Sequence, residues 1–126
     1  MKFSNIILID DDEEDQQIFL AALDQISTTI RYNFFTDARK ALGDLKSGNI
    51  TTQAIFLDLN MPLMSGQEFL AQIKQIENLK PIPIIIFTTS SSNSIKEMTL
   101  SMGAADFLTK PNDFRDLISL LQPFIY

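Results

Sequence analysis

Short apolar runs that alternate with helical patterns constrain the fold of this 126-residue chain more than any other feature. The clearest run lies at 55–57, where three apolar residues are too few for a helix and stand close to turn residues. Such a run is typical of a strand that is buried on both faces of a parallel sheet. It ends abruptly at Asp58. Ligands of open α/β sheets bind beyond the carboxyl ends of the strands, so Asp58 either caps the next turn or takes part in chemistry.

The same patterns predict four more strands and five helices. Residues 30–34 alternate polar and apolar side chains, which favours a half-exposed edge strand. The other strands are predicted over 5–9, 82–87 and 105–109. Apolar residues at helical spacing predict helices over 13–26, 37–46, 66–77, 94–102 and from 113 to within a residue or two of the end of the chain. Strands that alternate with helices predict an α/β fold, in which a parallel sheet carries helices on both faces.

The helical patterns also predict the environment of individual residues. Ile18 in the first helix and Met98 in the fourth belong to apolar stripes, so both are expected to face the core. Asp12 and Asn112 stand just before predicted helices and are expected to cap them.

A run of acidic residues follows the first predicted strand. Acids at 12–15 suit the positive end of a helix dipole, which explains that part of the run without any function. Asp10 and Asp11 are explained less well, because they continue a buried strand, where an unpaired charge is costly.

The composition excludes several classes of function. The net charge is −6 and Lys and Arg do not cluster, which disfavours non-specific binding to nucleic acid or to an anionic membrane. The chain has no Cys and no His, so it lacks thiolate and imidazole metal ligands, a Cys nucleophile and a Ser–His pair. No apolar run approaches the ~20 residues that span a bilayer, and the one near the N-terminus is too short for a signal peptide. We therefore expect a cytoplasmic protein.

A carboxylate, hydroxyl or ammonium group stands at the end of four predicted strands. These groups belong to Asp10 and Asp11, Asp58, Thr88 and Lys110. A parallel sheet brings them all to one edge. Clustered carboxylates repel one another and need a cation, and a site of oxygen ligands without His or Cys suits Mg²⁺ or Mn²⁺. A hydroxyl and an ammonium beside that cation predict a phosphoryl pocket, in which a carboxylate can attack phosphorus and form an aspartyl phosphate.

Four segments resemble motifs of the receiver domain of bacterial two-component response regulators. In chain order they read ILIDDD, LDLNMPLMSG, IPIIIFTTSS and GAADFLTKP. Each motif alone is moderately specific, whereas four in this order and spacing are highly specific and span essentially the whole chain. The resemblance implies a flavodoxin-like, doubly wound sheet of five parallel strands in the order 2-1-3-4-5, with five helices. It also implies a single receiver domain over 1–126 with no output domain.

The resemblance assigns roles to matching positions. Asp58 resembles the phosphoacceptor, Thr88 the switch hydroxyl and Lys110 the lysine that pairs with the phosphate. Phe107 occupies the position of the switch aromatic residue, and its lack of a hydroxyl removes any partner interaction through a Tyr hydroxyl. The bond between Lys110 and Pro111 would be a cis peptide.

The metal ligands follow from the same resemblance. Mg²⁺ or Mn²⁺ would be bound by Asp11, by Asp58 and by the backbone carbonyl of Asn60, with Asp10 acting through a water molecule. Three consecutive aspartates leave the acidic pair open between Asp10/Asp11 and Asp11/Asp12. The first is favoured, because Asp10 directly ends the apolar strand and Asp12 can cap the helix.

A sensor histidine kinase or a histidine phosphotransfer protein is the partner that this resemblance implies. Transfer to Asp58 would draw Thr88 toward the phosphoryl group and let Phe107 turn inward. The face made by the fourth helix, the fifth strand and the fifth helix would then change for a downstream protein target, or the phosphoryl group would pass on in a relay. Such a protein catalyses only its own phosphorylation and dephosphorylation and is not otherwise an enzyme.

Three alternatives fit the residues less well. A haloacid-dehalogenase-like phosphatase uses Asp-x-Asp after its first strand, which Asp10 and Asp12 match only formally, and the chain has no room for a cap domain. A flavodoxin-like cofactor site needs a hydroxyl- and Gly-rich loop there, whereas this loop is acidic and would repel phosphate. A degenerate receiver that serves only as an interaction module would not need intact Asp58, Thr88 and Lys110.

Overall fold

The sheet contains five strands in the computed structural model, which describes residues 1–126. They are β1 (Asn5–Ile9), β2 (Arg31–Phe35), β3 (Ala54–Leu57), β4 (Ile84–Thr88) and β5 (Asp106–Thr109). All pairs are parallel, and the order is β2-β1-β3-β4-β5. β3 and β4 are buried along their whole length, whereas the first three residues of edge strand β2 are exposed. The parallel sheet and its strand order confirm the predicted fold.

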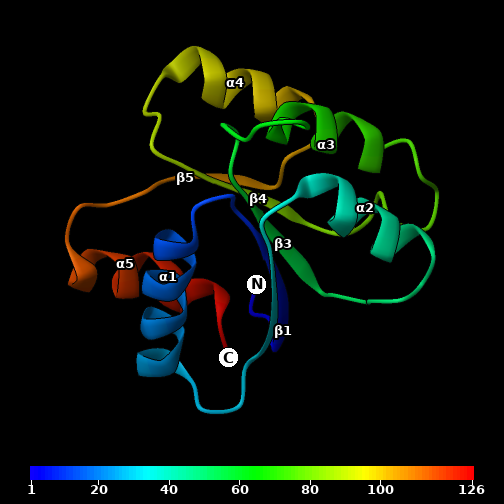
Figure 1. The fold of residues 1–126 in the computed structure, drawn as a ribbon. Coiled ribbons are helices and arrows are strands. Elements are labelled where there is room, and N and C mark those ends of the chain that lie inside the picture. Colours follow the sequence, from blue (N-terminus) through cyan, green and yellow to red (C-terminus); the bar gives the residue numbers. More distant parts are fainter.

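Five α-helices connect the strands and cover both faces of the sheet. They are α1 (Glu13–Ile26), α2 (Ala38–Lys46), α3 (Gly66–Ile73), α4 (Asn93–Ser101) and α5 (Phe114–Leu121), and a 3₁₀ turn, η1 (Gln122–Phe124), follows. α1 and α5 lie on one face, and α2, α3 and α4 lie on the other (Figure 1). The ends of the chain meet because Phe3 and Ile125 form a parallel bridge. No helix has both the length and the apolar character needed to cross a membrane.

The core consists of two hydrophobic clusters, one on each face of the sheet. Successive residues of a strand point to opposite faces. Ile84 and Ile86 of β4 therefore join the cluster under α2, α3 and α4, while Ile85 and Phe87 join the cluster under α1 and α5. In the second cluster, the rings of Phe19 and Phe87 meet edge to face, with their centroids 5.5 Å apart.

Ile18 and Met98, which the helical patterns place in the core, are exposed instead. Ile18 is 48% exposed and Met98 is 42% exposed. α1 buries another side, which carries Phe19 and Leu23, and α4 buries only Thr99. Both predictions were wrong, because the apolar side chains of each helix cover more of its surface than the neighbouring elements bury.

Two of the differences in helix boundaries are explained by hydrogen bonds. α3 stops at Ile73 rather than at 77, because the backbone just beyond it bonds to carbonyls three residues back and tightens into turns. α5 is capped by Asp113 and not by Asn112, since the carboxylate of Asp113 accepts the N–H of Arg115 at 2.7 Å. Asp12 caps α1 as expected.

Two backbone features lie in the loops at the carboxyl edge of the sheet. The bond between Lys110 and Pro111 is trans, so the expected cis peptide is wrong. Trans is the form that X–Pro bonds prefer by about 0.5–1 kcal/mol, and Lys110 reaches its partners without the cis form. Leu63, in the loop after β3, has a φ of 70° and is 72% exposed. That left-handed conformation is unusual for a residue with a branched side chain.

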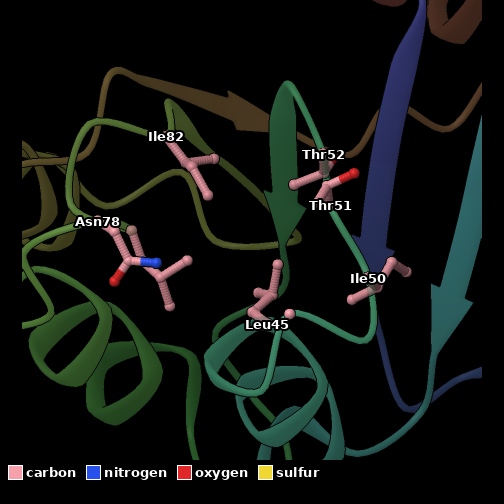
Figure 2. Close-up of a pocket in the computed structure, with 8 residues that line it drawn as sticks. Leu45, Ile50, Thr51, Thr52, Asn78 and Ile82 are labelled. Carbon is pink, nitrogen blue, oxygen red and sulfur yellow. The ribbon is translucent and has the colours of Figure 1, made fainter.

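A cavity of about 240 Å³ opens at the opposite edge of the sheet, where β3 and β4 begin (Figure 2). Its lining is apolar or uncharged and includes Leu45, Ile50, Thr51, Thr52, Asn78 and Ile82. None of the strand-end groups that the sequence singles out contributes to it. The candidate site therefore lies at the other edge.

Candidate functional site

Asp58 stands immediately after β3, and the backbone around it holds its carboxylate in place. Its N–H donates to the carbonyl of Ile9 at 3.0 Å, which continues the pairing of β1 with β3. One carboxylate oxygen, Oδ1, accepts the N–H of Leu59 at 2.9 Å. The residue is only 6% exposed. Asp58 is thus a nearly buried carboxylate with one oxygen, Oδ2, left for other partners.

Gly66 lets the first turn of α3 press against this strand end. A Cβ at residue 66 would overlap the carbonyl oxygen of Asp58 and would lie 2.7 Å from Cα of Leu59. The N–H of Gly66 donates to the carbonyl of Leu59 at 3.0 Å. Ser65 and Glu68 form a capping box that fixes the start of the helix. The loop that follows Asp58 is therefore held by a contact that only glycine allows.

Three carboxylates meet at this edge. Asp10, Asp11 and Asp58 each offer one oxygen, and these oxygens lie within 4.8 Å of one another. Asp10 is fully buried and its Oδ1 accepts the N–H of Asp12 at 3.0 Å, whereas Asp11 is exposed. The carboxylate of Asp12 is occupied elsewhere, since it accepts the N–H of Glu14 at 2.9 Å. The acidic cluster is therefore formed by Asp10, Asp11 and Asp58, while Asp12 serves the helix.

Lys110 reaches this acidic cluster from the end of β5. Its ammonium nitrogen, Nζ, donates to Oδ2 of Asp10 at 2.7 Å and to Oδ2 of Asp15 at 2.8 Å. The same nitrogen lies 3.8 Å from Oδ2 of Asp58. The side chain is 12% exposed, and Nζ lies 5.6 Å from the centroid of the Phe87 ring. One cation is thus shared among three carboxylates.

Thr88 ends β4 at the same edge and carries a free hydroxyl. The residue is fully buried, and its Oγ1 has no hydrogen-bond partner. Leaving a buried hydroxyl without a partner costs about 1–3 kcal/mol, so the Thr88 hydroxyl is suited to donate a hydrogen bond to a group that binds at this edge. The carbonyl of Thr88 accepts the N–H of Lys110 at 2.6 Å, which joins the ends of β4 and β5.

The other two predicted positions lie beside this site. Asn60 is an exposed loop residue two positions after Asp58. Phe107 is half-buried on β5 and packs against the cluster under α2, α3 and α4. The structure thus brings together the strand-end groups at one edge, with Asn60 in the adjoining loop and Phe107 on the strand that carries Lys110.

Residues 6–122 match the sequence model of the response regulator receiver domain. The chain belongs to the response regulator receiver family. The predicted resemblance is therefore confirmed, and the domain is a signalling module of two-component systems.

Relatives and solved structures agree with this assignment. The probable methanogenesis regulatory protein FilR2 of Methanothrix harundinacea is 31% identical, and the match covers 89% of this chain and 75% of that protein. The phosphorylated cyanobacterial phytochrome response regulator RcpA superposes with a TM-score of 0.86 at 25% identity, over 96% of this chain and 90% of the other. The Mn²⁺-bound form of response regulator Rcp1 has a TM-score of 0.84 at 27% identity, over 95% and 90%.

The electrostatics of the receiver site favour a further cation. Burial raises the pKa of Asp58 from its usual 3.8 to about 6, although the ammonium of Lys110 opposes the shift. Burial also raises the pKa of Asp10, against a hydrogen bond from Lys110. For Lys110, burial alone would lower the pKa, but its hydrogen bonds to Asp10 and Asp15 outweigh that effect and raise it. The Lys110 ammonium is therefore the one cation beside four carboxylates, which belong to Asp10, Asp11, Asp15 and Asp58. The oxygens of Asp10, Asp11 and Asp58 form a candidate divalent-metal site.

Two residues of the receiver site were missed by the sequence reasoning. The sequence explains Asp15 as an acid that suits the helix dipole, and nothing in it pairs Asp15 with Lys110, which is 95 positions away. Gln16 is 6% exposed and its Nε2 donates to the carbonyls of Asp10 (2.9 Å) and Phe35 (3.1 Å). A polar residue on the buried side of α1, three positions before Phe19, was a signal that could have been recognised.

Replacing Gln16 with Leu should lower the free energy of unfolding by about 1–3 kcal/mol, because two hydrogen bonds that join α1 to the ends of β1 and β2 are lost. Urea denaturation followed by circular dichroism measures the change. Gln17→Leu is the matched control, since Gln17 is exposed and donates to neither carbonyl. Equal stabilities of the two variants would contradict the expected role of Gln16.

Proposed function

We propose that this receiver domain accepts a phosphoryl group on Asp58 from the phosphohistidine of a sensor histidine kinase or a histidine phosphotransfer protein. The observation that carries the proposal is the meeting of the acidic cluster, the Lys110 ammonium and the free hydroxyl of Thr88 at one edge of the sheet. A nucleophile, an opposite charge and a hydrogen-bond donor are the groups that a transferred phosphoryl needs.

The donor set of the site fits a divalent ion. In this proposal Asp11, Asp58 and the backbone carbonyl of Asn60 are direct ligands, and Asp10 acts through a water molecule. All of these ligands are oxygens, which suits Mg²⁺ and also Mn²⁺. The structure of Rcp1, which this chain resembles, is described as Mn²⁺-bound. When bound, the ion neutralises carboxylate charge and polarises the phosphoryl oxygens.

The chain's own residues can carry the transfer. A carboxylate oxygen of Asp58 attacks phosphorus, an O–P bond forms, the N–P bond of the phosphohistidine breaks, and its electron pair returns to the imidazole ring. Lys110 offsets the charge on the phosphoryl oxygens, and the hydroxyl of Thr88 donates a hydrogen bond to one of them. Gly66 keeps the Asp58 loop close to its strand.

A conformational switch would then report the modification. The acyl phosphate adds about −1.5 to −2 charges to a nearly buried position. Thr88 moves toward it, Phe107 turns into the space that is vacated, and the face made by α4, β5 and α5 changes. Phosphorylation would thus shift the population between two conformations of one protein, and a downstream protein partner would bind one of them more tightly.

Acetyl phosphate provides the test of the proposed function. Incubation with Mg²⁺ should add the mass of one phosphoryl group, and EDTA should prevent the addition. Hydroxylamine should remove the group, since it cleaves acyl phosphates. Steady release of phosphate from small phosphate esters without a labelled intermediate would instead support a phosphatase.

A further inference from the structure

We infer that Asp15 is a positioning residue that holds the Lys110 ammonium away from Asp58 until a phosphoryl group arrives. This role of Asp15 rests on the proposed function, since it concerns which carboxylates bind Lys110 before and after phosphorylation of Asp58. Asp15 is not one of the strand-end groups, and it comes to the site from the first turn of α1.

The distances around Lys110 show an uneven division of its hydrogen bonds. Its Nζ lies 2.7 Å from Asp10, 2.8 Å from Asp15 and 3.8 Å from Asp58. An N–H···O hydrogen bond extends to about 3.2 Å, so Asp58 receives none. An ammonium group has three donors, and two of them are used by Asp10 and Asp15. The residue that would carry the phosphoryl group is thus the weakest partner of the lysine.

Asp10 and Asp15 differ in how easily they can release Lys110. The side chain of Asp10 is 1% exposed, and its second oxygen is held by the N–H of Asp12. The side chain of Asp15 is 34% exposed and makes no other hydrogen bond or ion pair. Water can therefore solvate Asp15 when the contact breaks, whereas an unpaired Asp10 would remain buried at high cost. Asp15 is the partner that the lysine can leave.

A phosphoryl group on Asp58 changes the competition for Lys110. It brings up to two negative charges close to an ammonium that has one free donor and lies 3.8 Å from Asp58, about 0.6 Å beyond the ~3.2 Å limit of a hydrogen bond. Movement toward the phosphoryl oxygens stretches the contact with Asp15 first. Removal of the Asp15 charge should therefore shift Lys110 toward Asp58 in advance and strengthen binding of a phosphoryl mimic.

Beryllofluoride with Mg²⁺ serves as the mimic, and Glu14→Gln is the control for Asp15→Asn. Glu14 lies in the same helical turn, is exposed and has no contact with Lys110, so its variant removes a nearby charge alone. Asp15→Asn should bind beryllofluoride about three- to tenfold more tightly than Glu14→Gln, as expected when one charge-assisted hydrogen bond is exchanged for another. Asp15→Glu should return the affinity toward the wild-type value.

A spectroscopic measurement follows the lysine itself, without metal or mimic. The ¹⁵Nζ signal of Lys110 is compared in the wild type, Asp15→Asn, Asp58→Asn and the double variant. Asp58→Asn alone should scarcely change the chemical shift of this signal, but it should change it clearly in a protein that already carries Asp15→Asn. The effects of the two substitutions are then not additive, which shows that they are coupled.

The outcomes separate this role from the proposed function. Equal beryllofluoride affinities of Asp15→Asn and Glu14→Gln would overturn the role of Asp15, because loss of either negative charge would then have the same effect. Weaker binding by Asp15→Asn would also overturn it and would mean that Asp15 presents the lysine to the site. If the wild type neither binds beryllofluoride nor becomes labelled, the proposed function fails, and the signal cycle still decides whether Asp15 holds Lys110 off Asp58.

Discussion

Asp58→Asn should abolish labelling of the receiver domain by acetyl phosphate or by a partner kinase while leaving the fold intact. The amide is a poor nucleophile, and no other carboxylate combines a nearly buried position with a free oxygen 3.8 Å from Lys110. The expected loss exceeds about 10²-fold, as is common when a catalytic nucleophile is removed. Mass spectrometry of the intact protein measures it. Asp116→Asn, at an exposed position of α5, is the control and should be labelled normally. Undiminished labelling of Asp58→Asn would mean that another residue is the acceptor.

The same variant should change stability in a pH-dependent way when no metal is present. The pKa of Asp58 is about 6 in the folded protein and near 3.8 when the chain is unfolded, chiefly because of burial. The folded state therefore retains a proton between these pH values, and stability falls as the pH rises through that window. Asp58→Asn should be more stable than the wild type by about 1–3 kcal/mol at pH 7.5, and the difference should vanish near pH 3.5. Urea denaturation at the two pH values measures both.

Gly66→Ala should have the largest effect on the structure of the site. The added Cβ would overlap the carbonyl oxygen of Asp58, and both sides of the contact are backbone, so no flexible side chain can yield. We expect a loss of about 3 kcal/mol in the free energy of unfolding, at the upper end for overpacking. Displacement of the loop also moves Asp58, the proposed acceptor, so the rate of labelling by acetyl phosphate should fall as well.

Gly43→Ala is the matched control for this prediction. Gly43 lies within α2, and a Cβ there would meet nothing within 4 Å. The substitution should therefore stabilise the protein by about 0.5–1 kcal/mol, because alanine loses less conformational freedom in a helix. Thermal denaturation of both variants gives the comparison. Similar values for the two would show that the contact between Gly66 and Asp58 does not constrain the loop.

The sheet and the location of the site were predictable from local sequence, because each rests on short-range patterns. Apolar runs at 55–57 and 82–87 predicted strands buried on both faces, and the helical segments between the strands predicted parallel pairing. Parallel pairing then places Asp58, Thr88 and Lys110 at one edge without any knowledge of distances.

The parts that could not be predicted depend on contacts between distant segments. The pairing of Asp15 with Lys110 joins the first turn of α1 to the residue that follows β5, and no local pattern records that contact. Ile18 and Met98 fit their helical stripes, yet their exposure depends on how much of each helix its neighbours cover. The left-handed backbone of Leu63 lacks the Gly or Asn that usually marks such a position.

The division of the core into two layers has a consequence for how such a domain can change over generations. Side chains of one cluster meet those of the other only through the backbone of the sheet, so substitutions in different layers should combine almost independently. Substitutions in the cluster under α2, α3 and α4 should therefore leave the packing of α1 and α5 nearly unchanged. The candidate site lies at the carboxyl edge of the sheet, which both layers share, and it can stay constant while the surface around it changes.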